Sequence, residues 1–141
     1  MPEPPPDAPR AAVPRIDWVQ LFFSSTGRAG RSTFLLAVAL LLAVFAGYEA
    51  AVSRIAHGLT AWAVHAVLLF AAACVLSKRL HDRGRSGWWA ALVLLAFAVV
   101  WPAPDDLVDF LFVLPLVWAA VDLGGLPGEA QANRFGGPPS R

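Results

Sequence analysis

Four long apolar runs limit what this chain can fold into. Ser32–Tyr48, Leu59–Ser77 and Trp88–Pro104 contain no Asp, Glu, Lys or Arg over 17, 19 and 17 residues. Leu107–Leu123 is a fourth and weaker run, with Pro115 in its middle. About 20 helical residues cross the ~30 Å hydrocarbon core of a bilayer. The runs therefore predict an all-α, polytopic membrane protein with four transmembrane helices. A re-entrant hairpin made by the last two runs is the alternative.

The composition supports the same class of protein. Of the 141 residues, 57% are hydrophobic and only 15% are charged, whereas an ordinary soluble domain carries about 25% charged residues. The single cysteine, Cys74, excludes an intrachain disulfide and a cysteine-based zinc site.

The ends of the chain differ from its middle. Residues 1–14 hold six of the twelve prolines, and such a segment is expected to be a disordered tail without an apolar core. Residues 15–126 carry the four runs and form the expected membrane domain. Residues 127–141 form a Gly/Pro-rich tail, expected in the cytoplasm, that contains the motif Asn133-Arg134-Phe135-Gly136.

A short aromatic helix is expected before the first span, within Arg15–Ser24. Ile16, Val19 and Phe22 fall on one helical face, and the segment is too short to cross a membrane. Such a helix lies in the membrane interface with Trp18 at headgroup depth. A cytosolic helix packed on the basic loop is the alternative.

Three further positions lie at the ends of, or inside, the first two spans. Ser32 or Thr33 is expected to cap the first span. Glu49 lies near the far end of this span, where it can reach water or pair with Arg54. Because an intramembrane acid is often functional, a proton relay between Glu49 and His65 is the alternative.

The basic residues predict the orientation. The first loop has only Arg54 and the third loop has no basic residue. The other ten of the eleven lie in the N-terminal segment, the second loop and the C-terminal tail: Arg10, Arg15, Arg28, Arg31, Lys78, Arg79, Arg83, Arg85, Arg134 and Arg141. Basic residues concentrate in cytoplasmic loops, so both termini are expected inside.

The second loop has the densest charge in the chain. Its ionisable residues are Lys78, Arg79, His81, Asp82, Arg83 and Arg85. If the second helix continues to Arg83 and ends at Gly84, Asp82 can pair with Lys78, Arg79 or Arg85. His81 then points toward the membrane surface or the N-terminal segment.

Three interpretations of this basic region remain open. It anchors the topology and attracts anionic headgroups without selectivity, or it forms a specific anion or lipid pocket in which arginines bind phosphate. In the third, His81 and Asp82 perform acid–base chemistry or bind a metal, although the pair lacks the further ligands of a metal site. No phosphate-binding loop, nucleophile elbow or HExxH motif is present. We expect no enzymatic activity, no cofactor and no nucleic-acid partner.

Three blocks of the sequence resemble the DUF805 family of small bacterial inner-membrane proteins. The blocks are Gly27-Arg28-Ala29-Gly30-Arg31-Ser32-Thr33-Phe34, Arg79-Leu80-His81-Asp82-Arg83-Gly84-Arg85-Ser86-Gly87-Trp88-Trp89, and Pro127-Gly128 followed by Asn133-Arg134-Phe135-Gly136 with Pro138. They are similar to the family patterns GRxxR-x-x-[FY], RLHD-x-x-RSxWW and PGxxNRFGxxP. The gap between Pro127-Gly128 and Asn133 is longer here, and the proline-rich start lies outside the pattern.

The resemblance implies a bacterial inner-membrane location but no established activity. It also implies which residues act together. We expect a cluster at the cytoplasmic face made of Arg28, Arg31, Arg79, His81, Asp82, Arg85, Asn133 and Arg134, with Asn133 and Phe135 attaching the tail to it. The predicted role is structural or interactive, with anionic phospholipid headgroups or a protein partner, including a second copy of the chain, as ligand. A small oligomeric transporter or channel and a lipid-modifying enzyme are the alternatives.

Overall fold

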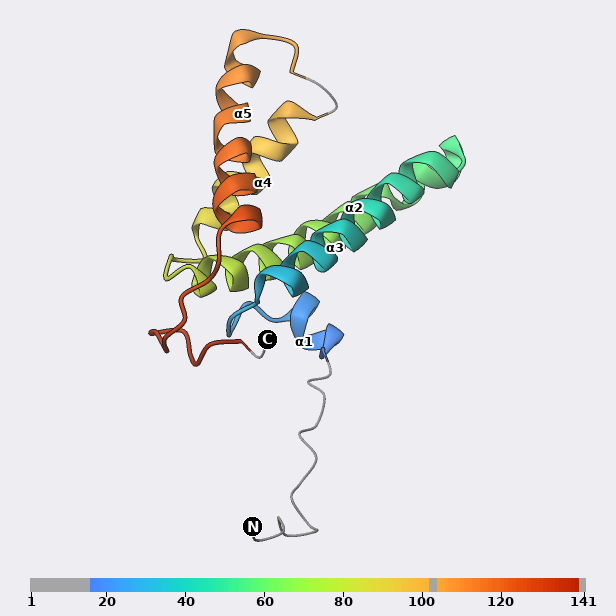
Figure 1. Ribbon diagram of the computed structural model, residues 1–141. Coiled ribbons are helices and arrows are strands. Elements are labelled where there is room, and N and C mark those ends of the chain that lie inside the picture. The colour runs from blue at the N-terminus through green and yellow to red at the C-terminus, as the bar shows by residue number, and fades with distance from the viewer. Residues whose placement is uncertain (1–15, 102–103, 140–141) are drawn as a thin grey trace, which may run out of the picture.

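The structure is a computed structural model that describes residues 16–101 and 104–139, so the expected tail at residues 1–14 lies outside the described residues. Within the described part the chain is all-helical, with one isolated β-bridge between Asn133 and Gly136 and no longer strand. Two helical hairpins leave a common base in different directions (Figure 1). The short first helix and the C-terminal segment lie at this base. The all-helical content confirms the predicted all-α class.

Helix α1 spans Trp18–Phe23 and is shorter than expected. It begins after Asp17, whose side chain caps it by accepting a hydrogen bond from the Gln20 N–H at 3.0 Å. Leu21 is buried, whereas Val19 and Phe23 are exposed. The helix packs against α3, since the Phe23 and Phe70 rings are 6.4 Å apart. One side of α1 therefore joins the core, and the other is apolar and uncovered.

Helices α2 (Arg31–Ala51) and α3 (Arg54–Asp82) form the first hairpin. Gly30, rather than Ser32 or Thr33, is the N-cap of α2. The expected cap by the Ser32 or Thr33 side chain is wrong, because the helix begins at Arg31, directly after backbone that is hydrogen-bonded to α3. The Ala29 N–H donates to the Lys78 carbonyl at 3.2 Å, and the helix starts at once.

The connection between α2 and α3 is shorter than the gap between the first two apolar runs, which end at Tyr48 and begin again at Leu59. Ser53 caps α3 by accepting from the Ala56 N–H at 3.4 Å, so the helix begins at Arg54. At the other end, Arg83 is the C-cap and Gly84 has a φ of +67°. The left-handed conformation favours glycine there. Helix α3 thus continues through most of the basic loop, which confirms the extension to this point.

Helices α4 (Trp89–Val100) and α5 (Leu107–Ala119) form the second hairpin, and a π-helical segment, η1 (Ala120–Gly125), continues α5. The Asp106 side chain caps α5 by accepting from the Asp109 N–H at 2.9 Å. Helix α4 has 12 residues, fewer than the 17-residue run Trp88–Pro104 predicts, because the backbone becomes extended at Trp101. Pro102 lies outside the described residues.

Three helical segments of the described chain are long and apolar enough to cross a membrane. They are Arg31–Ala51, Arg54–Asp82 and the continuous Leu107–Gly125, with mean hydropathies of 2.1, 2.2 and 2.0. Helix α4 is apolar but rises only about 18 Å at 1.5 Å per residue. The fold is therefore that of a membrane protein with at least three candidate spans.

The buried core lies at the base rather than along the two hairpins. Its members come from α1, the first turns of α2, the last turns of α3, the first turns of α4 and the end of α5 with η1; they include Leu21, Phe34, Val75, Leu80, Val93 and Leu123. Away from the base, large apolar side chains such as Leu40, Trp62 and Leu111 are exposed. Side chains are therefore closely packed at the base, whereas those farther along the two hairpins are largely exposed.

Candidate functional site

The centre of the base is a buried ion-pair triad. Asp82 Oδ1 accepts from Arg28 Nη2 at 2.9 Å and from Arg28 Nε at 3.1 Å, and Asp82 Oδ2 accepts from Arg79 Nη1. The side chains of Arg28, Arg79 and Asp82 are 1%, 0% and 2% exposed. Both carboxylate oxygens are therefore occupied by arginines. A buried charge left without such a partner costs several kcal/mol.

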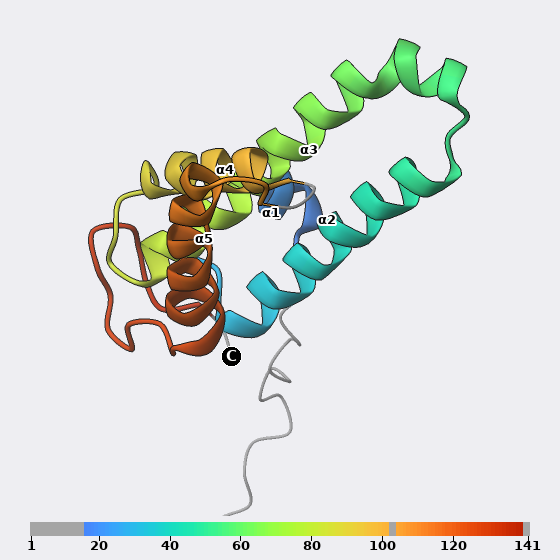
Figure 2. The same ribbon diagram turned by 90° about the horizontal axis from the view of Figure 1, so that it is seen from above.

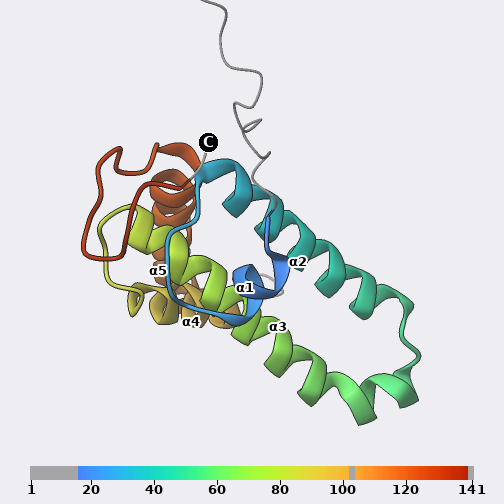
Figure 3. The ribbon, with the colours of Figure 1, turned by 90° about the horizontal axis from the view of Figure 1, so that it is seen from below.

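The two arginines also hold the C-terminal segment through its backbone carbonyls. Arg79 donates from Nε to the Leu123 oxygen at 2.7 Å and from Nη2 to the Leu126 oxygen at 2.6 Å. Arg28 donates from Nη1 to the Gln131 oxygen at 2.8 Å. In Figure 3 the C-terminal segment follows the end of α3 and the segment that precedes α2. The triad thus joins three parts of the chain that are distant in sequence.

A second ion pair lies beside the triad. Asp122 of η1 is 3.0 Å from Arg83 Nη2 and 3.4 Å from Arg85 Nε. Arg83 also donates from Nη1 to the Pro127 carbonyl at 2.6 Å. Asp122 and Arg83 were absent from the predicted cluster. The sequence did contain a clue to this pair. Asp122 lies at the end of the fourth apolar run, on the side where nearly all other charged residues are basic, so a basic partner such as Arg83 could be expected.

His81 is not paired with Asp82 and contacts both the segment that precedes α2 and the C-terminal segment. Its Nδ1 is 3.2 Å from the Gly27 carbonyl oxygen, and its ring stacks on Phe135 with centroids 3.9 Å apart and planes inclined by 9°. The Asn133 side-chain amide donates to the His81 carbonyl at 2.9 Å. The expected attachment of the tail through Asn133 and Phe135 is therefore present.

Two glycines permit the close approach of this tail. A Cβ added at Gly128 would lie 1.8 Å from Asp82 Oδ2, and one added at Gly84 would lie 2.3 Å from Glu129 Oε1. The Glu129 N–H donates to the Asp82 carbonyl at 2.9 Å, so the backbone of the tail lies directly on the end of α3. Any larger residue at Gly128 would displace the tail from the triad.

Three arginines of the predicted cluster keep exposed side chains. Arg31 makes one hydrogen bond, from Nη1 to the Gly125 carbonyl at 3.2 Å. The Arg85 guanidinium is 5.2 Å from the centroid of the Trp118 ring, and its side chain is 43% exposed. The Arg134 guanidinium is 4.7 Å from the centroid of the Phe135 ring. These three cations lie at the edge of the buried network.

Comparison with known proteins places the chain in a family. The profile described as "Protein of unknown function (DUF805)" matches residues 22–137. The chain belongs to the DUF805 family. It is similar to the uncharacterized protein YiiR of Escherichia coli, in strains K12 and O157:H7, with 35% identity over 129 residues that cover 83% of this chain and 86% of each relative. No solved structure matches the chain.

The DUF805 match includes the three sequence blocks except for Pro138, and the fold brings these blocks together. Arg28 comes from the first block, Arg79, His81 and Asp82 from the second, and Asn133 from the third. We call this assembly the base network: Arg28, Arg79, His81, Asp82, Arg83, Asp122, Glu129, Asn133 and Phe135. Arg31, Arg85 and Arg134 lie at its edge.

The chemistry at the centre of the base network is that of a structural cluster, and only Arg83 Nε and Asp122 Oδ2 are buried without a hydrogen-bond partner within the described residues. Asp82 is bound by two arginines, and His81 is stacked and not paired with Asp82. Within residues 16–101 and 104–139, the base does not gather three His, Cys, Asp or Glu side chains in a geometry suited to a metal. The base network therefore holds segments of this chain together, and the exposed arginines at its edge are the groups available to a ligand.

Proposed function

We propose that this DUF805 protein is a non-enzymatic, multi-pass protein of the bacterial inner membrane with a structural or interactive role. In this proposal it has four spans, both termini are cytoplasmic, and its basic face binds anionic phospholipid headgroups. The observation that carries the proposal is the division of the basic residues. The buried arginines bind the chain itself, whereas Arg31, Arg85 and Arg134 remain exposed at the edge of the base.

The arrangement of helix ends supports four spans. The first turns of α2 and α4 and the ends of α3 and of α5 with η1 all contribute to the core of the base, so each hairpin would leave the base and return to it. The connection at Ser53 and the loop containing Asp106 would then lie on the far side. A re-entrant α4–α5 hairpin would instead keep Asp106 within the bilayer or on the side of the base.

Labelling with a membrane-impermeant maleimide distinguishes these two topologies. In a Cys74→Ala background, single cysteines at Ser53, Ser86 and Asp106 report three connections. Four spans predict that Ser53→Cys and Asp106→Cys react from the periplasm and that Ser86→Cys reacts only after the membrane is opened. Labelling of Asp106→Cys in the same pattern as Ser86→Cys would contradict four spans.

Exposed aromatic residues support a headgroup position for the base. Trp18 of α1 is 43% exposed, and Trp88 at the start of α4 is 86% exposed. Tryptophan concentrates at the membrane–water interface, and a basic residue near an anionic leaflet contributes about 1 kcal/mol. Exposed cations beside exposed tryptophans are the combination that binds an anionic bilayer surface.

Native mass spectrometry with defined lipids tests the headgroup contact. The protein is purified in micelles containing equal amounts of phosphatidylglycerol and phosphatidylcholine, and the retained lipid is counted. At about 1 kcal/mol per cation, the Arg31→Gln/Arg134→Gln variant should lose roughly 30-fold in its preference for phosphatidylglycerol. Arg54→Gln, an exposed arginine at the far end of α3, is the control and should retain the preference. Equal loss in both variants would contradict a site at the base.

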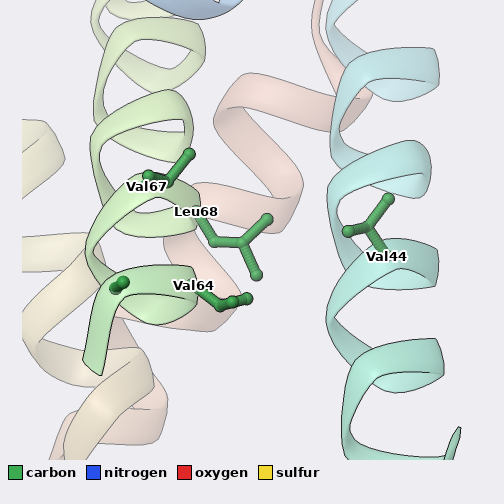
Figure 4. A pocket seen from close by; sticks show the side chains of 5 residues that line it. Val44, Val64, Val67 and Leu68 are labelled. Atoms are coloured by element: carbon green, nitrogen blue, oxygen red, sulfur yellow. The ribbon is translucent and has the colours of Figure 1, made fainter. Parts of the chain in front are cut away.

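The geometry gives less support to the two alternative functions. The groove between α2 and α3, of about 330 Å³, is lined only by apolar side chains, Val44, Ala63, Val64, Val67 and Leu68 (Figure 4). An aqueous path within one monomer needs polar lining at this point, so transport would require several copies. A lipid-modifying enzyme would need a free acid or base, whereas both oxygens of Asp82 bind arginines.

A further inference from the structure

A polar cluster lies at the end of the α2–α3 hairpin that is remote from the base. Glu49 Oε1 is 2.9 Å from His65 Nε2 and 3.2 Å from His57 Nε2. One ligand atom from each of the three side chains lies within 4.8 Å of the other two. The contact between Glu49 and His65, instead of Arg54, agrees with the alternative that the sequence left open, whereas the contribution of His57 was not predicted. The three side chains are 34–36% exposed, so the rest of the described chain does not enclose them.

The hairpin holds these side chains in place from both helices. The connection at Val52–Ser53 is short, and the His57 N–H donates to the Ser53 carbonyl at 2.8 Å. The Tyr48 and Thr60 hydroxyls, one from each helix, are 2.8 Å apart. Figure 2 shows the two helices joined at this end. The donors are therefore arranged by packed backbone rather than by a mobile loop.

The donor set has the chemistry of a metal site. Two imidazole nitrogens and one carboxylate oxygen bind Zn²⁺ in sites that keep a fourth position open to water, with metal–ligand distances of about 2.0–2.2 Å. Tetrahedral ligands at such distances are about 3.3 Å from one another. The separations of 2.9 and 3.2 Å between Glu49 Oε1 and the two Nε2 atoms are close to this value. A small movement of the side chains would place an ion between them.

The surroundings of the cluster also suit an ion. Phe45 and Tyr48 lie beside His65, with ring centroids 5.7 and 5.8 Å from the imidazole, and the Tyr48 ring is 5.2 Å from that of His57. Such rings limit the rotation of the imidazoles without competing for their nitrogens. The carboxylate offsets part of the charge of a divalent ion, which lowers the cost of binding near the bilayer.

We infer that Glu49, His57 and His65 form a binding site for a divalent first-row transition-metal ion, with Zn²⁺ as the simplest occupant and an open position facing solvent. This site is separate from the base, because it lies at the other end of α3. It therefore does not depend on the proposed lipid contact. Imidazole and carboxylate donors favour Zn²⁺, Cu²⁺ and Ni²⁺ over Mn²⁺.

The test uses the full chain in detergent micelles after treatment with a chelator. Co²⁺ is added as a spectroscopic probe, because its visible absorption reports coordination by protein ligands, and Zn²⁺ is then titrated to displace it. The expected result is one equivalent of bound metal. Glu49→Gln, His57→Gln and His65→Gln should each weaken binding by about 10–100-fold or more, since even loss of an outer-shell partner has this effect.

The chain supplies a matched control, because His81 is its third histidine and lies in the base network. His81→Gln should bind Co²⁺ with wild-type affinity. Zn²⁺ should raise the melting temperature of the wild type and of His81→Gln but not that of His57→Gln. His57 is in the first turn of α3, where a glutamine is compatible with the fold. Absence of stoichiometric binding, or equal weakening in His81→Gln, would overturn the inference, whatever the outcome of the lipid experiment.

Discussion

The two ends of α3 differ in how deeply their polar side chains are buried. At its C-terminal end, Arg79 and Asp82 are almost completely buried, and every oxygen of the carboxylate has an arginine partner. At its N-terminal end, His57 and His65 share one carboxylate oxygen of Glu49 and remain about one-third exposed. The same helix thus carries a closed network and an open one.

The difference teaches how to separate structural charges from groups available to a ligand. Removing one partner of a buried ion pair strongly destabilises the fold, because the remaining charge has neither a partner nor water around it. When a partially exposed group loses its partner, it can form new hydrogen bonds with water, so the free energy of unfolding changes little. Stability measurements should therefore respond to the base network, whereas ligand measurements should respond to the cluster at the far end.

The largest effect is expected from Asp82→Asn. Within the described chain, this change removes the only carboxylate that pairs with Arg28 and Arg79, and it leaves two buried guanidinium groups uncompensated. We expect a loss of about 3–5 kcal/mol in the free energy of unfolding, measured by denaturation in mixed micelles. Asp105→Asn, at an exposed position, should change it by no more than about 0.5 kcal/mol. Similar effects of the two variants would break the comparison.

A smaller effect is expected from Gly128→Ala. The added methyl group would lie 1.8 Å from Asp82 Oδ2, so the tail must move away from the triad. Overpacking of this kind costs about 1–3 kcal/mol. Limited proteolysis should show faster cleavage after Gly124 than in the wild type. Gly137→Ala, where nothing lies within 4 Å of the new Cβ, is the matched control and should be cleaved at the wild-type rate.

The smallest effect on stability is expected from Glu49→Gln. The amide retains the shape of the side chain, and the cluster is about one-third exposed, so the unfolding midpoint of the metal-free protein should stay within the scatter of the wild type. Denaturation under the conditions used for Asp82→Asn makes the two ends of α3 directly comparable. A midpoint as low as that of Asp82→Asn would show that Glu49 is a structural partner of the histidines.

Most residues of the base could be predicted from the sequence, but which of them pair with one another could not. The hydropathy pattern located the first two spans and the fourth run, and the sequence blocks named eight residues that the fold brings to one end. Asp122 was missed because it is 40 residues from Asp82 along the chain, and only the return of α5 to the base places it beside Arg83. The length of α4 was overestimated because apolar composition does not reveal that the backbone becomes extended at Trp101.

By itself, the sequence determined the class of the fold and the grouping of its charges. Apolar runs of about 20 residues specify membrane helices, since every backbone polar group must be satisfied within the segment. Tertiary structure alone decided which arginines are structural and which remain exposed, because that depends on whether the fold buries the guanidinium group beside a carboxylate, as it does for Arg28 and Arg79 at Asp82. It also decided that Glu49 meets His57 and His65, since only the antiparallel hairpin brings the end of α2 against α3.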